Sequence, residues 1–255
     1  MSEELLYEVK DRVAWLTINR ESKRNSISPE VVELFQRYLD DAEADENVRV
    51  VCLTGAGSKA FCSGADLGGA AATTVENPQQ AYANLLKRIS GYPKPTVARI
   101  NGTCLAGGTG FMLACDIVVA ADTAKFGTPE VNVGLWPMMI GALIFRNVLT
   151  KKAMEMILLG ERLSAQHAME MGLVTRVVPP EELDTEVEGI LENLGKKSPI
   201  GMKLGKEAFY RMRDMPFEEA LDFLVGRIRA VTETEDAKEG ITAFIEKREP
   251  NFRGK

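Results

Sequence analysis

The sequence predicts an α/β fold with a helical C-terminal region. Short β-branched runs alternate with apolar residues at helical spacing up to Val178, which is the rhythm of strands packed against helices. After Val178 the strand pattern stops, and several helical stretches separated by glycine, Ser-Pro and Met-Pro breaks follow. We therefore predict two regions, residues 1–180 and residues 181–255, with the change near Pro180.

The first predicted elements form a β-α-β unit. Residues Val13–Ile18 predict a strand, and Ser28 followed by Pro29 predicts the N-cap and first turn of a helix. Residues 48–54 form a β-branched run that ends in the turn G-A-G, and they predict the second strand. The helix between the two strands is indicated by apolar residues at helical spacing, namely Val31, Val32, Leu34, Phe35, Tyr38, Leu39 and Ala42.

A second unit begins at Thr96–Ile100, which predicts a strand. The glycine-rich residues 101–110 lead into an apolar helix that ends at Cys115, and residues 116–120 predict another strand. Before this unit, the small residues 68–74 (G-G-A-A-A-T-T) predict a mobile loop.

The C-terminal helices carry an apolar stripe wide enough to dock on the first region or on another subunit. The stripe is formed by Phe217, Ala220, Leu221, Phe223, Leu224 and Ile228. We therefore expect obligate oligomerisation.

The composition fits one globular domain, or one domain with a helical extension, because 45% of the 255 residues are hydrophobic and 27% are charged. The net charge of −6 and the lack of basic blocks interleaved with aromatics argue against nucleic acid as a partner. No apolar run is long enough for a membrane span or, in the first twenty residues, for a signal peptide, so we expect a cytoplasmic protein.

The numbers of histidines and cysteines and their places in the sequence argue against several catalytic mechanisms. The single histidine, His167, removes support from Ser-His-Asp and Cys-His catalysis and from a multi-histidine site, and we expect no metal. The four cysteines are scattered without a C-x-x-C pair, which predicts reduced thiols in the core.

Three segments carry the functional signal. They are K-A-F-C-S-G-A-D-L at 59–67, N-G-T-C-L-A-G-G-T-G-F at 101–111 and F-G-T-P-E-V-N-V-G-L at 126–135. Supporting stretches are N-R-E-S-K-R-N-S-I-S, G-E-R-L-S-A-Q-H-A-M-E-M-G-L-V and G-I-T-A-F-I-E-K-R. Their order and spacing resemble the enoyl-CoA hydratase/isomerase (crotonase) superfamily over essentially the whole chain. Each motif alone is weak, because glycine-rich turns are common.

The resemblance implies a crotonase-like spiral of β-β-α units with a helical C-terminal trimerisation region, assembled as a trimer or a hexamer. It also implies an acyl-CoA thioester as the substrate. Coenzyme A then enters as part of that substrate, so no separate cofactor is expected.

Ala65 and Gly107 match the two positions whose backbone N–H groups form the family's oxyanion hole. A backbone N–H can approach a thioester oxygen closely only where side chains are small, and the helix that starts near Gly107 favours negative charge at its N-terminus. Taken alone, A-G-G is explained equally well by a tight helix–sheet contact. Together with the G-A-D segment, we expect it to form the oxyanion hole.

Glu130 matches one of the family's two catalytic glutamates, and it follows an apolar strand and a proline where partial burial raises a carboxyl pKa. Without the resemblance, an exposed loop glutamate is the simpler interpretation. The second glutamate of the hydratases falls at Gly110, so one carboxylate is missing. One base suffices to move a proton from C2 to C4, and Δ3,Δ2-enoyl-CoA isomerases of the family resemble this pattern.

We therefore expect a 3-enoyl-CoA to 2-enoyl-CoA isomerase. The first alternative is a hydratase in which Glu130 works with a second group that the sequence does not identify. The second alternative is a non-catalytic acyl-CoA-binding member, which Gly110 favours and Glu130 disfavours.

Substrate-binding residues are expected in five places along the chain. Lys23 and Arg24 are candidate phosphate partners, and Ser63, Asp66 and Leu67 resemble residues that line the adenine and pantetheine side, although Asp66 also fits a helix N-cap. The acyl pocket is expected to be shaped by Gly110, Trp136, Met138 and Met139. Phe244 and Lys247 match the aromatic and lysine that the family supplies from a neighbouring subunit, but a core phenylalanine and a solvated lysine explain them equally.

Overall fold

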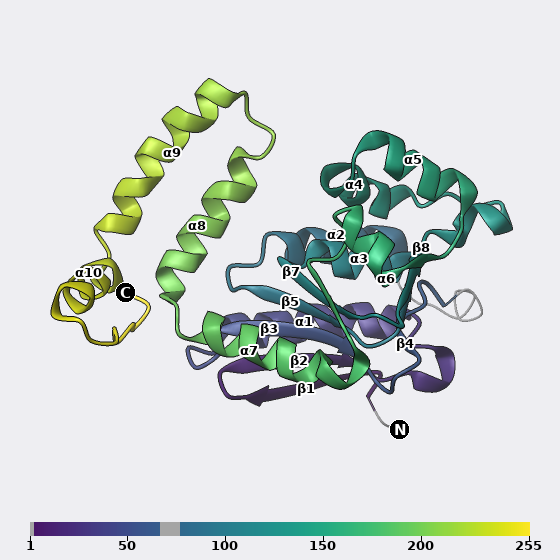
Figure 1. The fold of residues 1–255 in the computed structure, drawn as a ribbon, viewed down its shortest axis with the longest axis horizontal. Coiled ribbons are helices and arrows are strands. Elements are labelled where there is room, and N and C mark those ends of the chain that lie inside the picture. The colour runs from purple at the N-terminus through teal and green to yellow at the C-terminus, as the bar shows by residue number, and fades with distance from the viewer. Residues whose placement is uncertain (1–2, 67–76) are drawn as a thin grey trace.

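The computed structural model describes residues 3–66 and 77–255. The loop predicted at 68–74 and the candidate residue Leu67 lie outside the described residues. Figure 1 shows two sheets covered by helices, with a helical arm that extends from them.

The larger sheet has six strands in the order β1-β2-β3-β5-β7-β10. Its strands are β1 (Leu5–Lys10), β2 (Val13–Ile18), β3 (Val50–Gly55), β5 (Thr96–Ile100), β7 (Ile117–Ala121) and β10 (Arg176–Val178). β1 pairs antiparallel with β2, and the remaining pairs are parallel. The sequence predicted β2 and β5 correctly and placed β3 and β7 within two residues of their bounds, but it missed β1 and β10.

Both faces of this sheet are buried, and β3 shows why its residues form a continuous apolar run. Val51 and Leu53 join the core beneath α1 (Pro29–Ala44), whereas Val50 and Cys52 join the cluster packed by α7 (Leu183–Gly195). Successive strand residues face opposite sides of a sheet, so a strand covered on both faces must be apolar throughout.

Helix α1 confirms the predicted start signal. The Oγ atom of Ser28 accepts a hydrogen bond from the backbone N–H of Val31 at 3.1 Å, and Pro29 occupies the first turn. All seven predicted apolar positions are buried. The helical spacing of these apolar residues was therefore enough to predict both the helix and its buried face.

The smaller sheet has the order β4-β6-β8-β9. Its strands are β4 (Ala60–Cys62), β6 (Thr103–Leu105), β8 (Lys125–Gly127) and β9 (Leu163–Ser164). The first three are mutually parallel, and β9 pairs antiparallel with β8. Strands this short show no usable alternation, which is why the sequence analysis did not predict them.

Further helices cover the sheets and build the region around the smaller one. They are α2 (Pro78–Ser90), α3 (Gly107–Ala114), α4 (Met138–Asn147), α5 (Thr150–Leu159) and α6 (Ala165–Glu170). Short 3₁₀ turns η1 (Glu21–Lys23), η3 (Pro129–Val133) and η4 (Pro180–Glu182) connect elements. The sequence analysis predicted α3 but overlooked α2, which begins at N-cap Asn77 and Pro78.

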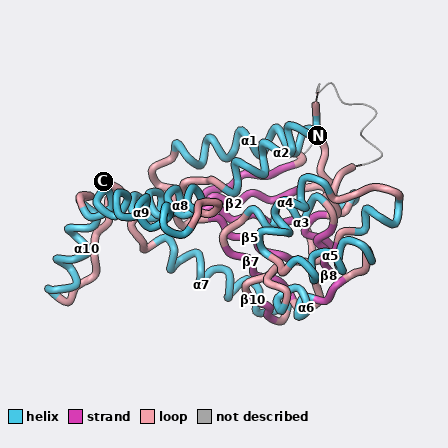
Figure 2. Tube along the Cα trace, turned by 90° about the horizontal axis from the view of Figure 1, so that it is seen from above, coloured by secondary structure: helices cyan, strands magenta, loops and turns pink. Residues whose placement is uncertain are grey.

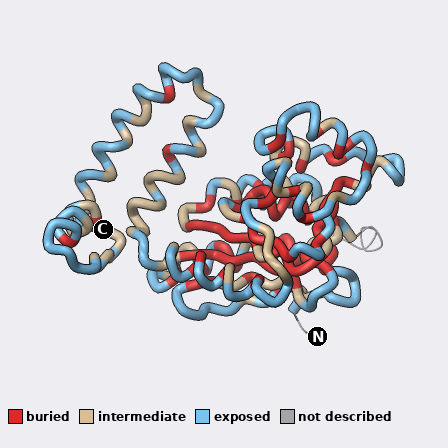
Figure 3. Tube along the Cα trace, viewed as in Figure 1, coloured by how far each residue is buried: buried red, intermediate tan, exposed pale blue. Residues whose placement is uncertain are grey.

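The arm consists of α8 (Pro199–Met212), α9 (Phe217–Thr232) and α10 (Glu235–Glu246). Figures 1 and 2 show α8 and α9 as an antiparallel hairpin that stands away from the sheets, and Figure 3 shows α9 mostly exposed and α8 mostly at intermediate exposure. Half of the predicted apolar stripe is therefore uncovered within one chain, with Phe217 77%, Leu221 49% and Ile228 58% exposed, whereas Ala220 is buried and Phe223 and Leu224 are half-buried. Among the described helices, none is long and apolar enough to cross a membrane.

Candidate active site

The three predicted catalytic residues follow the ends of three adjacent parallel strands. Ala65 lies three residues after β4, Gly107 two residues after β6, and Glu130 three residues after β8. Neighbouring strands in a sheet are about 4.8 Å apart, so their carboxyl ends open into one region. The smaller sheet thus brings together segments that are far apart in the sequence.

After β4, the chain runs beside Ile27. The N–H of Ile27 donates to the carbonyl of Gly64 at 2.8 Å, and the N–H of Asp66 donates to the carbonyl of Ile27 at 2.9 Å. Because Ile27 makes both bonds of this parallel bridge, the N–H of Ala65 points away from Ile27. Ala65 is exposed, so this donor is directed outward where a ligand can reach it.

After β6, the backbone makes a strained turn into α3. Ala106 adopts φ +50° and ψ −126°, a conformation that costs a non-glycine residue on the order of 1–3 kcal/mol. Its N–H donates to the carbonyl of Gly127 at 3.0 Å, which ties the turn to the end of β8. Gly107 is the first residue of α3, where backbone N–H groups lack partners within the helix.

Gly64 joins the two turns. A Cβ atom placed on Gly64 would lie 2.6 Å from the Cβ of Ala106 and 3.2 Å from the backbone nitrogen of Gly107. Gly64 also has φ +96°, which disfavours any other residue. The close approach of the Ala65 and Gly107 segments therefore depends on this glycine.

Glu130 lies in η3 and is half-buried. Its Oε2 atom is buried and has no hydrogen-bond partner among the described residues. Burial raises the pKa of the Glu130 carboxyl above its ordinary value of 4.5, although a hydrogen bond from its own backbone opposes the shift. A half-buried carboxylate with one unsatisfied oxygen is suited to accept a proton from a substrate.

The position of the missing second carboxylate is filled by other side chains. A Cβ atom placed on Gly110 would lie 2.2 Å from the Oη atom of Tyr82 and 2.7 Å from Cγ2 of Ile140. The Oη of Tyr82 donates to the carbonyl of Gly107 at 2.5 Å. The sequence analysis missed Tyr82 and Ile140; the spacing of Tyr82, Leu85, Leu86 and Ile89 could have revealed α2 and its buried face.

The loop at residues 20–27 supports the Ala65 segment. The guanidinium of Arg20 pairs with Asp66 at 2.8 Å and with Glu4 at 2.9 Å. Asp66 is therefore an ion-pair partner of Arg20 in this structure, and a helix that it would cap would begin in residues 67–76, which lie outside the described residues. The backbone N–H of Ser63 donates to the carbonyl of Arg24 at 3.2 Å, so the Arg24 loop lies beside the end of β4. Lys23 and Arg24 are both exposed there.

The remaining candidates lie at the surface. Trp136, Met138 and Met139 follow Glu130 and are 43%, 71% and 38% exposed. Phe244 is 84% exposed on α10, and Lys247 caps that helix in a left-handed conformation. Within one chain, α10 packs with α8 and α9, so Phe244 and Lys247 are not brought to the three strand ends.

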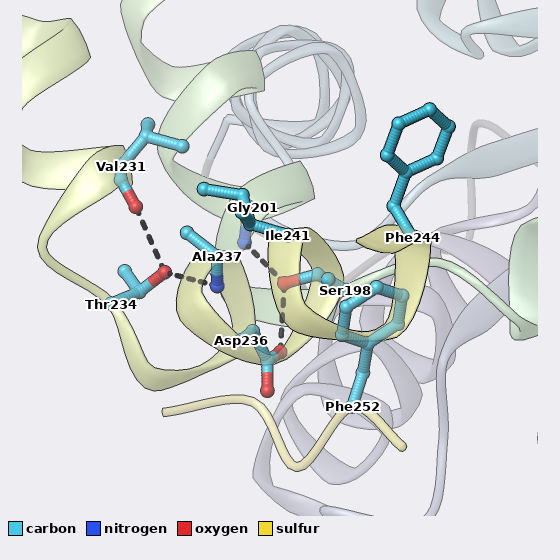
Figure 4. Close-up of a pocket in the computed structure, with 10 residues that line it drawn as sticks. Ser198, Gly201, Val231, Thr234, Asp236, Ala237, Ile241, Phe244 and Phe252 are labelled. Atoms are coloured by element: carbon cyan, nitrogen blue, oxygen red, sulfur yellow. Dashed lines mark hydrogen bonds between the residues drawn. The ribbon is translucent and has the colours of Figure 1, made fainter. Parts of the chain in front are cut away.

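Figure 4 shows a separate pocket of about 350 Å³ in the arm. Ser198 at its base donates to Asp236 at 2.7 Å and accepts from the N–H of Gly201 at 3.0 Å. Phe252 closes one side, and Phe244 stands at the rim. The residues that line this pocket are distinct from Ala65, Gly107 and Glu130.

The four cysteines are buried and unpaired, as predicted, and burial raises their thiol pKa values, that of Cys62 to about 12. In residues 3–66 and 77–255, no three His, Cys, Asp or Glu side chains are grouped so as to hold a metal ion. The chemically distinctive elements of the site are thus two backbone donors and one carboxylate.

Comparisons with known proteins identify the family of the whole chain. The family model described as enoyl-CoA hydratase/isomerase matches residues 8–255. The chain is 38% identical to a putative enoyl-CoA hydratase of Thermus thermophilus, over 95% of this chain and 98% of that protein. It is 34% identical to the (E)-benzylidenesuccinyl-CoA hydratase of Thauera aromatica, over 97% of this chain and 98% of that protein.

Solved structures show the same fold. The crystal structure of an enoyl-CoA hydratase from Bacillus anthracis superposes with a TM-score of 0.93 at 35% identity, covering 99% of this chain and 100% of that one. The predicted spiral with C-terminal helices is confirmed by this likeness.

Proposed function

The chain belongs to the enoyl-CoA hydratase/isomerase family, and we propose that it moves the double bond of a 3-enoyl-CoA to the 2-enoyl position. Its family and relatives make it an enzyme that processes acyl-CoA thioesters as an enoyl-CoA hydratase or isomerase. The finer choice of isomerisation rests on one observation. Glu130 offers an unsatisfied carboxylate oxygen, whereas the second carboxylate position is glycine and is filled by Tyr82 and Ile140.

The proposed reaction uses Glu130 twice. Its carboxylate takes the proton from C2, and the electron pair of the broken C–H bond spreads through the thioester carbonyl and the C3–C4 double bond. The N–H groups of Ala65 and Gly107 stabilise the negative charge on the thioester oxygen. C4 then takes the proton back from Glu130, which leaves a double bond between C2 and C3 and restores the carboxylate.

Coenzyme A binding and assembly are part of this proposal. The exposed Lys23 and Arg24 lie beside the end of β4, where cations can pair with phosphates of coenzyme A. Phe244 and Lys247 require a neighbouring subunit to reach such a ligand. The exposed part of the apolar stripe on α9, formed by Phe217, Leu221 and Ile228, supports assembly as a trimer or hexamer, because exposed apolar surface marks a protein interface.

Hydration is the second candidate, and the names of the relatives favour it, since both curated relatives described above are called hydratases. This candidate requires a second group that activates water, and neither Tyr82 nor Ile140 is a base at neutral pH.

One spectrophotometric experiment separates the two candidates. Isomerisation of a 3-enoyl-CoA creates the absorbance of the conjugated thioester, and hydration of crotonyl-CoA removes it. We expect isomerisation to exceed hydration by at least about a hundredfold, the usual size of one general acid–base contribution. Rapid hydration with little isomerisation would overturn the proposal, and Glu130→Gln serves as the inactive control in both assays.

A further inference from the structure

We propose that Tyr82 determines the reaction specificity of this site, because its hydroxyl stands where the first side-chain carbon of a residue larger than glycine at position 110 would lie. The inference deepens the proposed function and rests on it. In chemical terms, Tyr82 holds a neutral, immobile hydroxyl where a second acid–base group would stand, so that Glu130 acts alone.

The steric part follows from the surroundings of Gly110. A Cβ atom there would lie 2.2 Å from Tyr82 Oη, 2.7 Å from Ile140 Cγ2 and 3.2 Å from Leu86 Cδ2. Non-bonded carbon atoms pack at about 3.5–4.0 Å, so even a methyl group is too large. A glutamate at 110 therefore cannot coexist with Tyr82 in this position.

Tyr82 has little freedom to move aside. Its side chain is buried with 8% exposure, and α2, which carries it, packs beside α3 (Figure 1). Its ring contacts Phe111 with the centroids 5.5 Å apart and the planes inclined at 58°. The hydrogen bond of 2.5 Å to the carbonyl of Gly107 fixes the hydroxyl end. Both ends of the side chain are thus held.

The hydroxyl also differs chemically from a carboxylate. Burial raises the pKa of the Tyr82 hydroxyl well above its ordinary value of 10. The hydroxyl stays protonated at every physiological pH, and its one proton is donated to Gly107. It can orient a water molecule through its lone pairs, but it cannot take a proton from that water.

A stability measurement tests the steric claim without any reaction. We expect Gly110→Ala to lower the melting temperature by several degrees in the wild-type background. The loss should be smaller in Tyr82→Leu, because leucine does not reach the Oη position and the added methyl then meets only Ile140 and Leu86. Equal losses in both backgrounds would overturn the proposal, since Tyr82 would then add nothing to the contacts with Ile140 and Leu86.

Activity tests the specificity claim. The double variant Tyr82→Leu/Gly110→Glu is expected to gain hydration of crotonyl-CoA at least about tenfold over wild type and over Tyr82→Leu alone. A folded double variant that hydrates no faster than wild type overturns the proposal. If the double variant does not fold, the melting-temperature comparison decides the matter.

Tyr82→Phe tests whether the hydroxyl takes part in the chemistry. We expect the ratio of isomerisation to hydration in this variant to stay within about tenfold of wild type, as in the matched control Tyr92→Phe. Tyr92 is another buried tyrosine, and its hydroxyl donates to the carbonyl of Leu39 at 2.7 Å. A change of about a hundredfold in this ratio in Tyr82→Phe alone would give the hydroxyl an acid–base role and overturn the space-filling role.

Different results refute the proposed isomerisation and the proposed role of Tyr82. Rapid hydration by the wild-type protein would refute the proposed isomerisation, whatever the variants do. Equal losses of melting temperature on Gly110→Ala with and without Tyr82 would refute only the role of Tyr82.

Discussion

Gly64→Ala is expected to separate the two proposed oxyanion donors. The added methyl carbon would lie 2.6 Å from the Cβ of Ala106, whereas carbon atoms pack at about 3.5–4.0 Å. The Ala65 and Gly107 segments must therefore move apart by about 1 Å. A misplacement of about 1 Å in a catalytic site can cost on the order of a hundredfold in rate.

Gly64→Ala also strains the backbone, and a control variant must separate this loss of stability from the effect of moving the two segments apart. Gly64 has φ +96°, and an alanine forced into a sparsely populated conformation loses about 1–3 kcal/mol of stability. Gly254→Ala is the matched control, because Gly254 has φ +80° and its added methyl would meet Pro199 at an ordinary 3.5 Å. Both variants carry the strain, but only Gly64→Ala forces the two segments apart.

The assay is kcat/KM on a 3-enoyl-CoA, followed at the conjugated thioester band, with circular dichroism and thermal unfolding on both variants. We expect Gly64→Ala to lose about a hundredfold in kcat/KM, whereas Gly254→Ala stays within about threefold. A folded Gly64→Ala protein with wild-type kcat/KM would show that the spacing of these turns does not control the reaction.

The remaining predictions concern the base Glu130, the donor Gly107 and the assembly. Glu130→Gln should abolish turnover and keep acyl-CoA affinity within several-fold; unchanged turnover would remove Glu130 from the mechanism. Because the folded-state pKa of Glu130 is raised, ionisation opposes folding, so Glu130→Gln should be the more stable protein at pH 8 and lose this advantage below the ordinary pKa of 4.5. In the pH profile of wild-type kcat/KM, the apparent pKa on the acid side should likewise lie above 4.5. An apparent pKa at or below 4.5 would contradict the raised pKa of Glu130. Gly107→Pro, checked for folding by circular dichroism, should lower the rate by about a hundredfold, and a near-normal rate would refute the donor assignment. Sedimentation should show a trimer or hexamer, and truncation after Pro180 should give insoluble or inactive material; an active full-length monomer would contradict this.

The local pattern of apolar residues, caps and turns was enough to predict the helices and strands that are long or have clear ends. The apolar stripe of α1 and its Ser28 cap predicted both the helix and its buried face, and the β-branched runs predicted β2, β3, β5 and β7. It was insufficient for β4, β6 and β8, because three residues show no period. β1 carries apolar residues that the sequence analysis overlooked, and α2 has a start signal at Asn77 and Pro78 that was also missed.

The sequence by itself was enough to predict the chemistry of the candidate site, because Ala65, Gly107 and Glu130 lie in segments that resemble the family's motifs and Gly110 stands where the hydratases of the family have a second glutamate. Only the tertiary structure decided what stands in that carboxylate's place. Tyr82 and Gly110 lie on different helices, and the contact between them arises from the packing of α2 on α3. Local sequence encodes the type of an element through its own periodicity, but the space left beside a glycine depends on which distant side chain the fold brings to it.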